Sequence, residues 1–186
     1  MTEPVTTRCG FAAIIGAPNA GKSTLVNRLV GSKVAIVSPK VQTTRARVLG
    51  IAIDGPAQII WVDTPGIFQP RRRLERAMVA TAWKGAEDAD LMIHLVDADR
   101  GLDPDARRIM EQLKGSGRKA ILALNKIDSI KLERLLPLAA EMADSGAYSE
   151  TFMISALNGD GVADLAARVS ALMPAGPWLY PEDQIA

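Results

Sequence analysis

Short apolar segments alternate along the chain with longer segments in which apolar residues recur every three or four positions. The apolar segments have the length of buried strands, which we expect near residues 11–15, 48–53, 58–62, 90–97, 119–124 and 150–154. The periodic segments predict helices near residues 22–30, 74–84, 104–114, 131–144 and 162–173. This alternation favours a mostly parallel sheet that is covered by helices on both faces.

One pair of neighbouring strands is expected to run antiparallel. Residues 53–56, Ile-Asp-Gly-Pro, form a turn signal between the second and third predicted strands, so these two strands predict a hairpin. The expected fold class is therefore α/β, with a six-stranded sheet that has one antiparallel edge strand. Ligands of such sheets bind at the carboxyl ends of the strands, so polar residues at those ends are the candidates for function.

The first predicted strand ends in the pattern GxxxxGK[ST], which covers Gly16–Ser23. The pattern lies between an apolar strand and a helix, which is the context of a phosphate-binding loop. Glycines let backbone N–H groups curl around phosphate oxygens, and the helix N-terminus favours an anion. Lys22 adds a positive charge for the β- and γ-phosphates, and the hydroxyl of Ser23 is suited to binding Mg²⁺.

Two later strand ends indicate that the base is guanine. The fifth predicted strand ends in Asn125–Asp128, and the Asp128 carboxylate can accept hydrogen bonds from the N1–H and the 2-amino group of guanine. Adenine lacks this donor pair and would leave the carboxylate unmatched. Ser155-Ala156-Leu157 follows the last predicted strand, where a backbone N–H can bind the guanine oxygen.

The third predicted strand ends in Asp63-Thr-Pro-Gly66, the DxxG pattern. Its carboxylate can hold Mg²⁺, usually through water, and the Gly66 N–H can approach a γ-phosphate without a side chain in the way. Upstream, the aperiodic segment 42–45 contains two threonines where a nucleotide-sensing loop would lie. A threonine hydroxyl can complete the shell of the metal, and Thr44 is favoured over Thr43.

Together these elements resemble the Era family of the translation-factor-related P-loop GTPases. The resemblance runs from about residue 9 to the last residue and rests on segments 16–27, 42–45, 63–67, 125–128 and the ending 180–183. It implies the three-layer fold of a P-loop NTPase of the small G-protein type. It also implies a GTP-hydrolysing switch that acts in assembly of the small (30S) ribosomal subunit and maturation of its 16S rRNA.

Two alternatives remain open. Sister families that act on tRNA modification or on other assembly steps share most of these motifs. A nucleotide-gated binding module with negligible hydrolysis of its own also fits the residues. A single-turnover rate of GTP hydrolysis, compared with the rate without protein, distinguishes an enzyme from a binding module. Identification of the bound RNA distinguishes the Era family from its sister families.

The predicted site combines nucleotide, metal and catalytic residues. Contacts to GTP or GDP are predicted for Asn19, Ala20, Gly21, Lys22, Ser23, Thr24, Asp63, Gly66, Asn125, Lys126, Asp128, Ser155, Ala156 and Leu157. Mg²⁺ is predicted on Ser23, Thr44 and Asp63. Catalytic contributions are predicted from Lys22, Thr44, Gly66 and Asn19.

The catalytic group itself is not identified by the sequence. Ile67 stands where Ras-like proteins carry a glutamine that orients the attacking water, and isoleucine has no hydrogen-bonding group. Related GTPases use an asparagine at the place of Asn19 to hold a potassium ion. Asn19 either does the same here or only shapes the loop.

Composition limits the partners and the location. Lys and Arg total 22 against 21 Asp and Glu, so the net charge of +1 gives no general attraction to nucleic acid. The single cysteine, Cys9, excludes an internal disulfide. Neither a signal peptide nor a bilayer-spanning apolar run stands out, so we expect a cytoplasmic protein. We further expect a monomer, with peripheral membrane association as an additional interaction.

Residues 1–8 are predicted to be disordered or extended, residues 9–174 to form the GTP-binding domain, and residues 175–186 to begin a linker. The resemblance implies that this linker leads to a C-terminal KH domain, absent here, which makes most of the contact with rRNA. Other polar features have simpler readings. His94 is expected to be packed or surface-facing, Asp97 and Asp99 to cap a turn, and Arg71–Arg73 to lie in a solvated loop or contact RNA phosphates.

Overall fold

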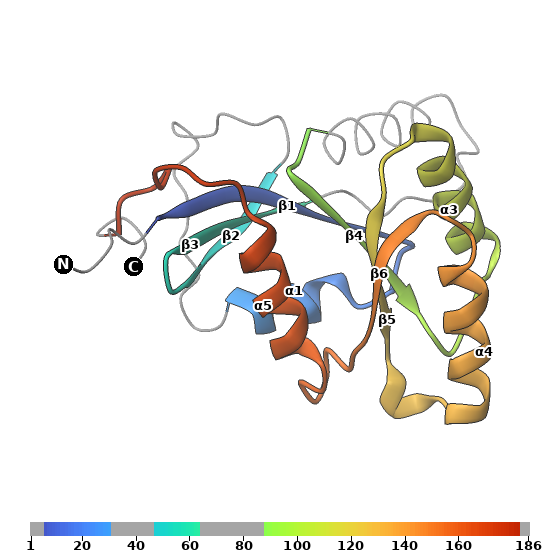
Figure 1. The fold of residues 1–186 in the computed structure, drawn as a ribbon. Coiled ribbons are helices and arrows are strands. Elements are labelled where there is room, and N and C mark those ends of the chain that lie inside the picture. The colour runs from blue at the N-terminus through green and yellow to red at the C-terminus, as the bar shows by residue number, and fades with distance from the viewer. Residues whose placement is uncertain (1–5, 31–46, 64–87, 183–186) are drawn as a thin grey trace.

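The computed structural model describes residues 6–30, 47–63 and 88–182. These residues form a six-stranded sheet with the strand order β2-β3-β1-β4-β5-β6 (Figure 1). The strands are β1 (Arg8–Gly16), β2 (Arg47–Asp54), β3 (Ala57–Asp63), β4 (Leu91–Asp97), β5 (Ala120–Asn125) and β6 (Tyr148–Met153). Neighbouring strands are parallel except for the hairpin of β2 and β3. The predicted α/β fold with one antiparallel edge strand is confirmed.

Helices cover both faces of the sheet. They are α1 (Lys22–Val30), α3 (Pro104–Ser116), α4 (Leu132–Ala143) and α5 (Val162–Leu172), and a 3₁₀ turn, η2 (Ile127–Ser129), follows β5. The apolar side chains of α1 and α5 join one buried cluster, and those of α3 and α4 join the other. The strands supply both clusters with alternate residues, since successive strand side chains point to opposite faces. Figure 1 shows α1 and α5 together on one side of the sheet, away from α3 and α4.

The sequence located these elements to within a few residues. Helix α1 has the predicted bounds, and α3 starts at the predicted Pro104, with Asp103 accepting a hydrogen bond from the Ala106 N–H at 2.8 Å. Strand β1 begins three residues before the predicted start, because Arg8 and Cys9 pair with β3. The helix predicted at 74–84 lies outside the described residues. Among the described helices, none combines the length and apolar character that crossing a membrane requires.

The segment after α5 is anchored at the amino ends of β1 and β3. Ala175 forms an antiparallel bridge with Arg8. The buried side chain of Gln58 donates to the Tyr180 carbonyl at 2.8 Å and accepts from the N–H groups of Leu179 and Tyr180, each at 3.1 Å. Residues 175–180 are thus part of the packed domain, and a linker toward a further domain stays a prediction.

Candidate nucleotide-binding site

The loop between β1 and α1 depends on two glycines. Gly21 has a φ of 103°, and a Cβ added there would run into the side-chain amide of Asn125. A Cβ on Gly16 would lie 2.7 Å from the Leu95 carbonyl oxygen of β4. Asn19 also has a positive φ, 69°, a conformation that asparagine tolerates better than most side chains. The predicted loop is therefore held close to β4 and to the end of β5, and it leads into the N-terminus of α1, which favours an anion.

Asn125 joins three segments of the site. Its side chain is buried at the end of β5, where its Nδ2 donates to the Ala20 carbonyl at 2.9 Å. Its Oδ1 accepts from the Ala156 N–H, also at 2.9 Å. The phosphate loop, the end of β5 and the loop after β6 are thus fixed to one another through one amide. The sequence predicted Asn125 as a nucleotide contact but not this connecting role.

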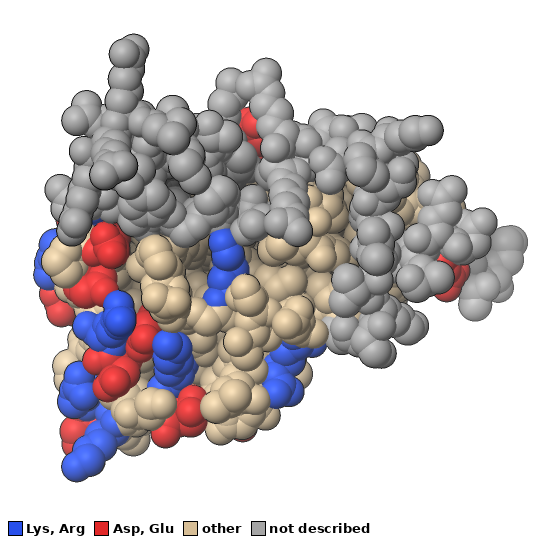
Figure 2. Space-filling view, turned by 180° about the vertical axis from the view of Figure 1, so that it is seen from behind, with Lys and Arg blue, Asp and Glu red and all other residues tan. Residues whose placement is uncertain are grey.

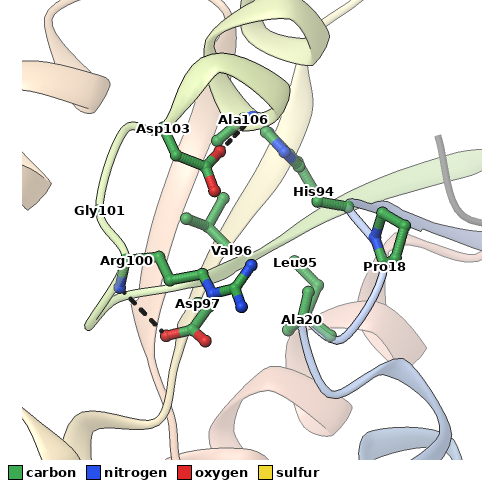
Figure 3. A pocket seen from close by; sticks show the side chains of 11 residues that line it. Pro18, Ala20, His94, Leu95, Val96, Asp97, Arg100, Gly101, Asp103 and Ala106 are labelled. Atoms are coloured by element: carbon green, nitrogen blue, oxygen red, sulfur yellow. Dashed lines mark hydrogen bonds between the residues drawn. The ribbon is translucent and has the colours of Figure 1, made fainter. Parts of the chain in front are cut away.

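Lys126 makes a second connection. It has a φ of 69°, and its Nζ lies 3.0 Å from the Asn19 carbonyl oxygen and 2.9 Å from Asp97 Oδ2. Asp97 Oδ1 accepts from the N–H groups of Asp99 and Arg100, and Figure 3 shows the Arg100 bond. Burial alone would raise the pKa of Asp97, but the Lys126 hydrogen bond, the two N–H donors and the Lys126 charge together lower it. The predicted turn cap is present, whereas the ion pair with Lys126 was not predicted.

A cavity of about 200 Å³ lies where the three segments meet. Its walls are formed by Gly21, Thr24, Asn125, Lys126, Asp128, Ser129, Ala156 and Leu157. All of these except Ser129 were predicted from the sequence as nucleotide contacts, and the structure brings them together around one space. That they bind a nucleotide stays a prediction.

Asp128 of this cavity has the Ser155 hydroxyl as its neighbour. The Ser155 hydroxyl lies 2.8 Å from Asp128 Oδ1 and 2.7 Å from Asn158 Oδ1, and it can donate to only one of them at a time. The Asn158 N–H in turn donates to the Ser155 oxygen at 3.2 Å. The carboxylate predicted to recognise guanine therefore has the Ser155 hydroxyl within hydrogen-bonding distance, and Ser155 contacts the cavity lining through Asp128.

A second, much smaller cavity separates the phosphate loop from the start of α3 (Figure 3). Its volume of about 10 Å³ is close to that of a single water molecule. His94 of β4 contributes to its lining and is fully buried, with Nδ1 2.7 Å from the Tyr148 hydroxyl. Burial lowers the pKa of His94 to about 3. Of the two expectations for His94, the packed one is correct.

The residues predicted to bind Mg²⁺ are only partly described. Ser23 is exposed in the first turn of α1, and Asp63 ends β3 opposite Ile14 of β1. The Asp63 side chain, Thr44, Gly66, Ile67 and Arg71–Arg73 lie outside what is described. Ser23 and Asp63 offer the oxygen ligands that Mg²⁺ prefers, and their strand and helix ends adjoin the same loop. Within the described residues no group of three or more His, Cys, Asp or Glu could hold a metal ion. Of the two aspartates expected to cap a turn, Asp97 accepts from backbone N–H groups, whereas the side chain of Asp99 contacts Arg134 at 3.4 Å.

Known proteins share this architecture and sequence. The family described as 50S ribosome-binding GTPase matches residues 11–126. GTPase Era of Caulobacter vibrioides is 58% identical, over 100% of this chain and 64% of that protein. The chain belongs to the Era family of GTPases. It spans less than two thirds of the length of this Era relative.

Two solved Era structures have the same fold. A variant of Era from Aquifex aeolicus bound to GDP·AlF₄⁻ is 40% identical, with a TM-score of 0.79 over 95% of this chain and 61% of that one. Era in complex with MgGDPNP and nucleotides 1506–1542 of 16S ribosomal RNA has the same identity and coverage, and its TM-score is 0.80. The fold and family expected from the sequence are thereby confirmed.

Proposed function

We propose that this chain binds GTP and GDP with Mg²⁺, hydrolyses GTP, and serves as a switch in assembly of the small ribosomal subunit and maturation of 16S rRNA. The observation that carries the nucleotide assignment is the cavity that contains Asp128, joined to the phosphate loop through the Asn125 amide. The ribosomal assignment is supported by the Era relative that was solved with 16S rRNA. The description of the matching family names the 50S subunit instead, so binding of this chain has to be measured with both ribosomal subunits.

Binding would divide between the two connected parts of the site. The loop amides, the start of α1 and the Lys22 ammonium would hold the phosphates. Asp128 would accept from guanine N1–H and the 2-amino group, while Asn125 and Lys126 keep the base cavity in register with the phosphate loop. A base without the donor pair would leave Asp128 desolvated and unpaired, which is the physical basis for selecting guanine.

Hydrolysis would rely on charge stabilisation by fixed groups. Ser23, Thr44 and Asp63 would hold Mg²⁺, which when bound neutralises charge on the β- and γ-phosphate oxygens. Lys22 and the loop amides would stabilise the same charge, and the Gly66 N–H would face the γ-phosphate. Ile67 can neither orient a water molecule nor take its proton. A further positive charge would stabilise the transition state, and we propose that a potassium ion supplies it. The side chain of Asn19 is exposed in the phosphate loop and would help to bind this ion.

The two alternatives carried from the sequence are related functions. One is action on tRNA modification or on another assembly step, and the other is a nucleotide-gated module that hardly hydrolyses GTP. Neither has an observation in its favour that the Era assignment lacks.

A cytoplasmic location, a monomeric state and peripheral membrane association complete the proposal. Light scattering after gel filtration tests the monomer, and flotation with anionic vesicles tests the membrane association.

The test combines binding with single-turnover hydrolysis. We expect GDP to bind and ADP to fail to compete at equal concentration. We expect slow, Mg²⁺-dependent hydrolysis that Lys22→Ala and Ser23→Ala abolish and that Ile67→Ala changes by less than about tenfold, about 1.4 kcal/mol of barrier. Lys114→Ala, which removes an exposed charge on α3, is the matched control. Equal competition by ADP would refute the guanine site, and hydrolysis no faster than in buffer would favour the binding module.

A further inference from the structure

Arg28 of α1 holds the loop that follows β6. Its Nε donates to the Ala156 carbonyl oxygen at 2.8 Å, and its Nη2 donates to the Leu157 carbonyl oxygen at 2.6 Å. The planar guanidinium suits two successive carbonyls because its donors are fixed relative to one another. The loop also lies close to this group, since a Cβ on Gly159 would be 2.8 Å from Arg28 Nη1. A residue two turns beyond the phosphate loop therefore sets the position of the base-binding loop.

Three of the four N–H groups of residues 155–158 have a protein partner. The Ser155 N–H donates to the Asp160 carbonyl at 2.9 Å, and the Ala156 N–H donates to Asn125 Oδ1. The Asn158 N–H donates to the Ser155 hydroxyl oxygen. Within the described part of the chain, the Leu157 N–H alone among the four has no protein partner, and Leu157 lines the 200 Å³ cavity. Among residues 155–158, this N–H is therefore the donor available to a ligand in the cavity.

The Leu157 N–H belongs to the same peptide group as the Ala156 carbonyl, to which Arg28 donates. A peptide group is planar and trans, so fixing its carbonyl also fixes the direction of its N–H. A charged donor on the carbonyl polarises the group and makes the N–H a stronger donor. Arg28 thus acts on this N–H without any contact of its own with a ligand.

The geometry points to Arg28 as a positioning residue that orients and polarises the Ala156–Leu157 peptide so that the Leu157 N–H binds the 6-oxygen of guanine. This inference rests on the proposed function, because it assumes that guanine occupies the cavity. It adds a residue of α1 to the groups that determine base specificity. A loop-stabilising role alone would weaken every nucleotide equally, whereas positioning acts only on ligands with a strong acceptor at the 6-position.

The test compares GDP with 6-thio-GDP on the 186-residue chain. The two ligands keep the same donors toward Asp128 and differ only at the 6-position, where sulfur is a weak acceptor. We expect the wild type to prefer GDP by about tenfold, the effect of one good hydrogen bond. We expect Arg28→Ala to weaken GDP about tenfold and 6-thio-GDP at most about twofold, so that the preference is largely lost. Arg28→Lys should retain part of it, because one ammonium can donate to one carbonyl.

A folding defect would not change the ratio of the affinities for GDP and 6-thio-GDP, because a smaller fraction of folded protein lowers the binding of both ligands alike. Arg168→Ala is the matched control: Arg168 Nε lies 2.9 Å from both carboxylate oxygens of Glu150 on β6, and its removal should leave the ratio unchanged. Equal weakening of both ligands by Arg28→Ala, or an unchanged ratio, would overturn the role of Arg28. A wild type that binds ADP as well as GDP would instead overturn the proposed function on which it rests.

Discussion

Asn125 illustrates how much of this site depends on single side chains. One amide satisfies the Ala20 carbonyl on one side and the Ala156 N–H on the other, and both bonds are buried. A backbone polar group left unpaired in such a place costs about 1–3 kcal/mol, so the two loops cannot separate from β5 cheaply. Lys126 repeats the arrangement nearer the surface with Asn19 and Asp97. Base and phosphate recognition are consequently coupled at the level of individual residues.

Asp128→Asn should change the base that the site selects. The variant loses the acceptor for guanine N1–H, and we expect GDP to bind roughly 100-fold more weakly, about 2.7 kcal/mol. Xanthosine diphosphate should gain affinity, because its 2-position is an acceptor that the new amide can match. Competition titrations with the two nucleotides measure both effects. Asp164→Asn, at an exposed position in the first turn of α5, should alter neither. Unchanged GDP affinity in Asp128→Asn would rule out the assignment of this carboxylate.

His94 should make the stability of the fold depend on pH. Its pKa is about 3 in the folded chain against an ordinary value of 6.5, because burial disfavours the charged ring. The unfolded chain therefore binds a proton that the folded chain does not bind between pH 6.5 and pH 3, and stability is lost as the pH falls through this window. The loss should reach about 2 kcal/mol between pH 7.5 and pH 5.

Urea unfolding at the two pH values measures this loss, and His94→Gln supplies the comparison. Glutamine does not titrate and can still reach the Tyr148 hydroxyl, so its stability should hardly change over the same interval. His94 is the only histidine of the chain, so no other imidazole can mask the difference. An equal loss in wild type and variant would show that His94 is protonated in the folded state.

At the scale of elements, the sequence predicted the strands, helices and loops that follow from a local pattern of residues. The described strands and helices were located because each carries the apolar period of its own structure, and the GxxxxGK[ST] loop because its spacing is fixed. The 3₁₀ turn at 127–129, the Asp97–Lys126 pair and the Arg28 contact were not predicted. The Asp97–Lys126 pair and the Arg28 contact depend on which distant segments meet in the folded chain, and a local sequence pattern does not show this. The 3₁₀ turn is local, with the Ser129 N–H donating to the Lys126 carbonyl at 3.0 Å, but three residues are too few to show an apolar period.

Gly21→Ala should separate the phosphate loop from the end of β5. The φ of 103° strains any side chain, and the added Cβ collides with the Asn125 amide that joins the loops. We expect GDP affinity to fall roughly 100-fold, about 2.7 kcal/mol. Gly146→Ala is the matched control: its φ is 84°, but a Cβ there meets nothing within 4 Å. It should cost about 1 kcal/mol of stability and leave GDP binding unchanged, as isothermal titration and urea unfolding can establish. Equal GDP affinity in the two variants would contradict the collision.

At the scale of the whole molecule, the two ends of the sheet carry different structures. The nucleotide cavity lies at the carboxyl ends of the strands, and the anchored segment 175–180 lies at the amino ends of β1 and β3. Strand β3 connects them, since Gln58 holds the segment and Asp63 ends the same strand near the phosphate loop. The site residues of that strand and the chain beyond α5 are thus parts of one packed body.

Charge is balanced at the same scale. Figure 2 shows Lys and Arg side chains interspersed with Asp and Glu over the part of the surface formed by α3 and α4, with no broad field of one sign there. Several of these charges are paired, such as Arg134 with Asp99 at 3.4 Å. Three of the aromatic side chains, Trp61, Tyr148 and Tyr180, are buried and cannot stack on bases. The described surface therefore has few features that would hold an RNA strand.

We accordingly expect the 186-residue chain by itself to bind 16S rRNA weakly, with a dissociation constant above roughly 10 µM at physiological salt. Counterion release from a few phosphate contacts supplies little affinity, and the net charge of +1 adds no steering. Filter binding to the 3′ end of 16S rRNA, with GDP and with a non-hydrolysable GTP analogue, measures the constant, and an unrelated RNA of equal length is the control. We expect the two RNAs to bind alike and the salt dependence to be shallow.

Replacing Arg71–Arg73 by alanine should then change little, because we expect these residues to respond to the nucleotide rather than to hold RNA. Tight binding that distinguishes the two RNAs would mean that an RNA site lies within these residues after all, and its loss on replacement of the three arginines would place it beside the DxxG loop.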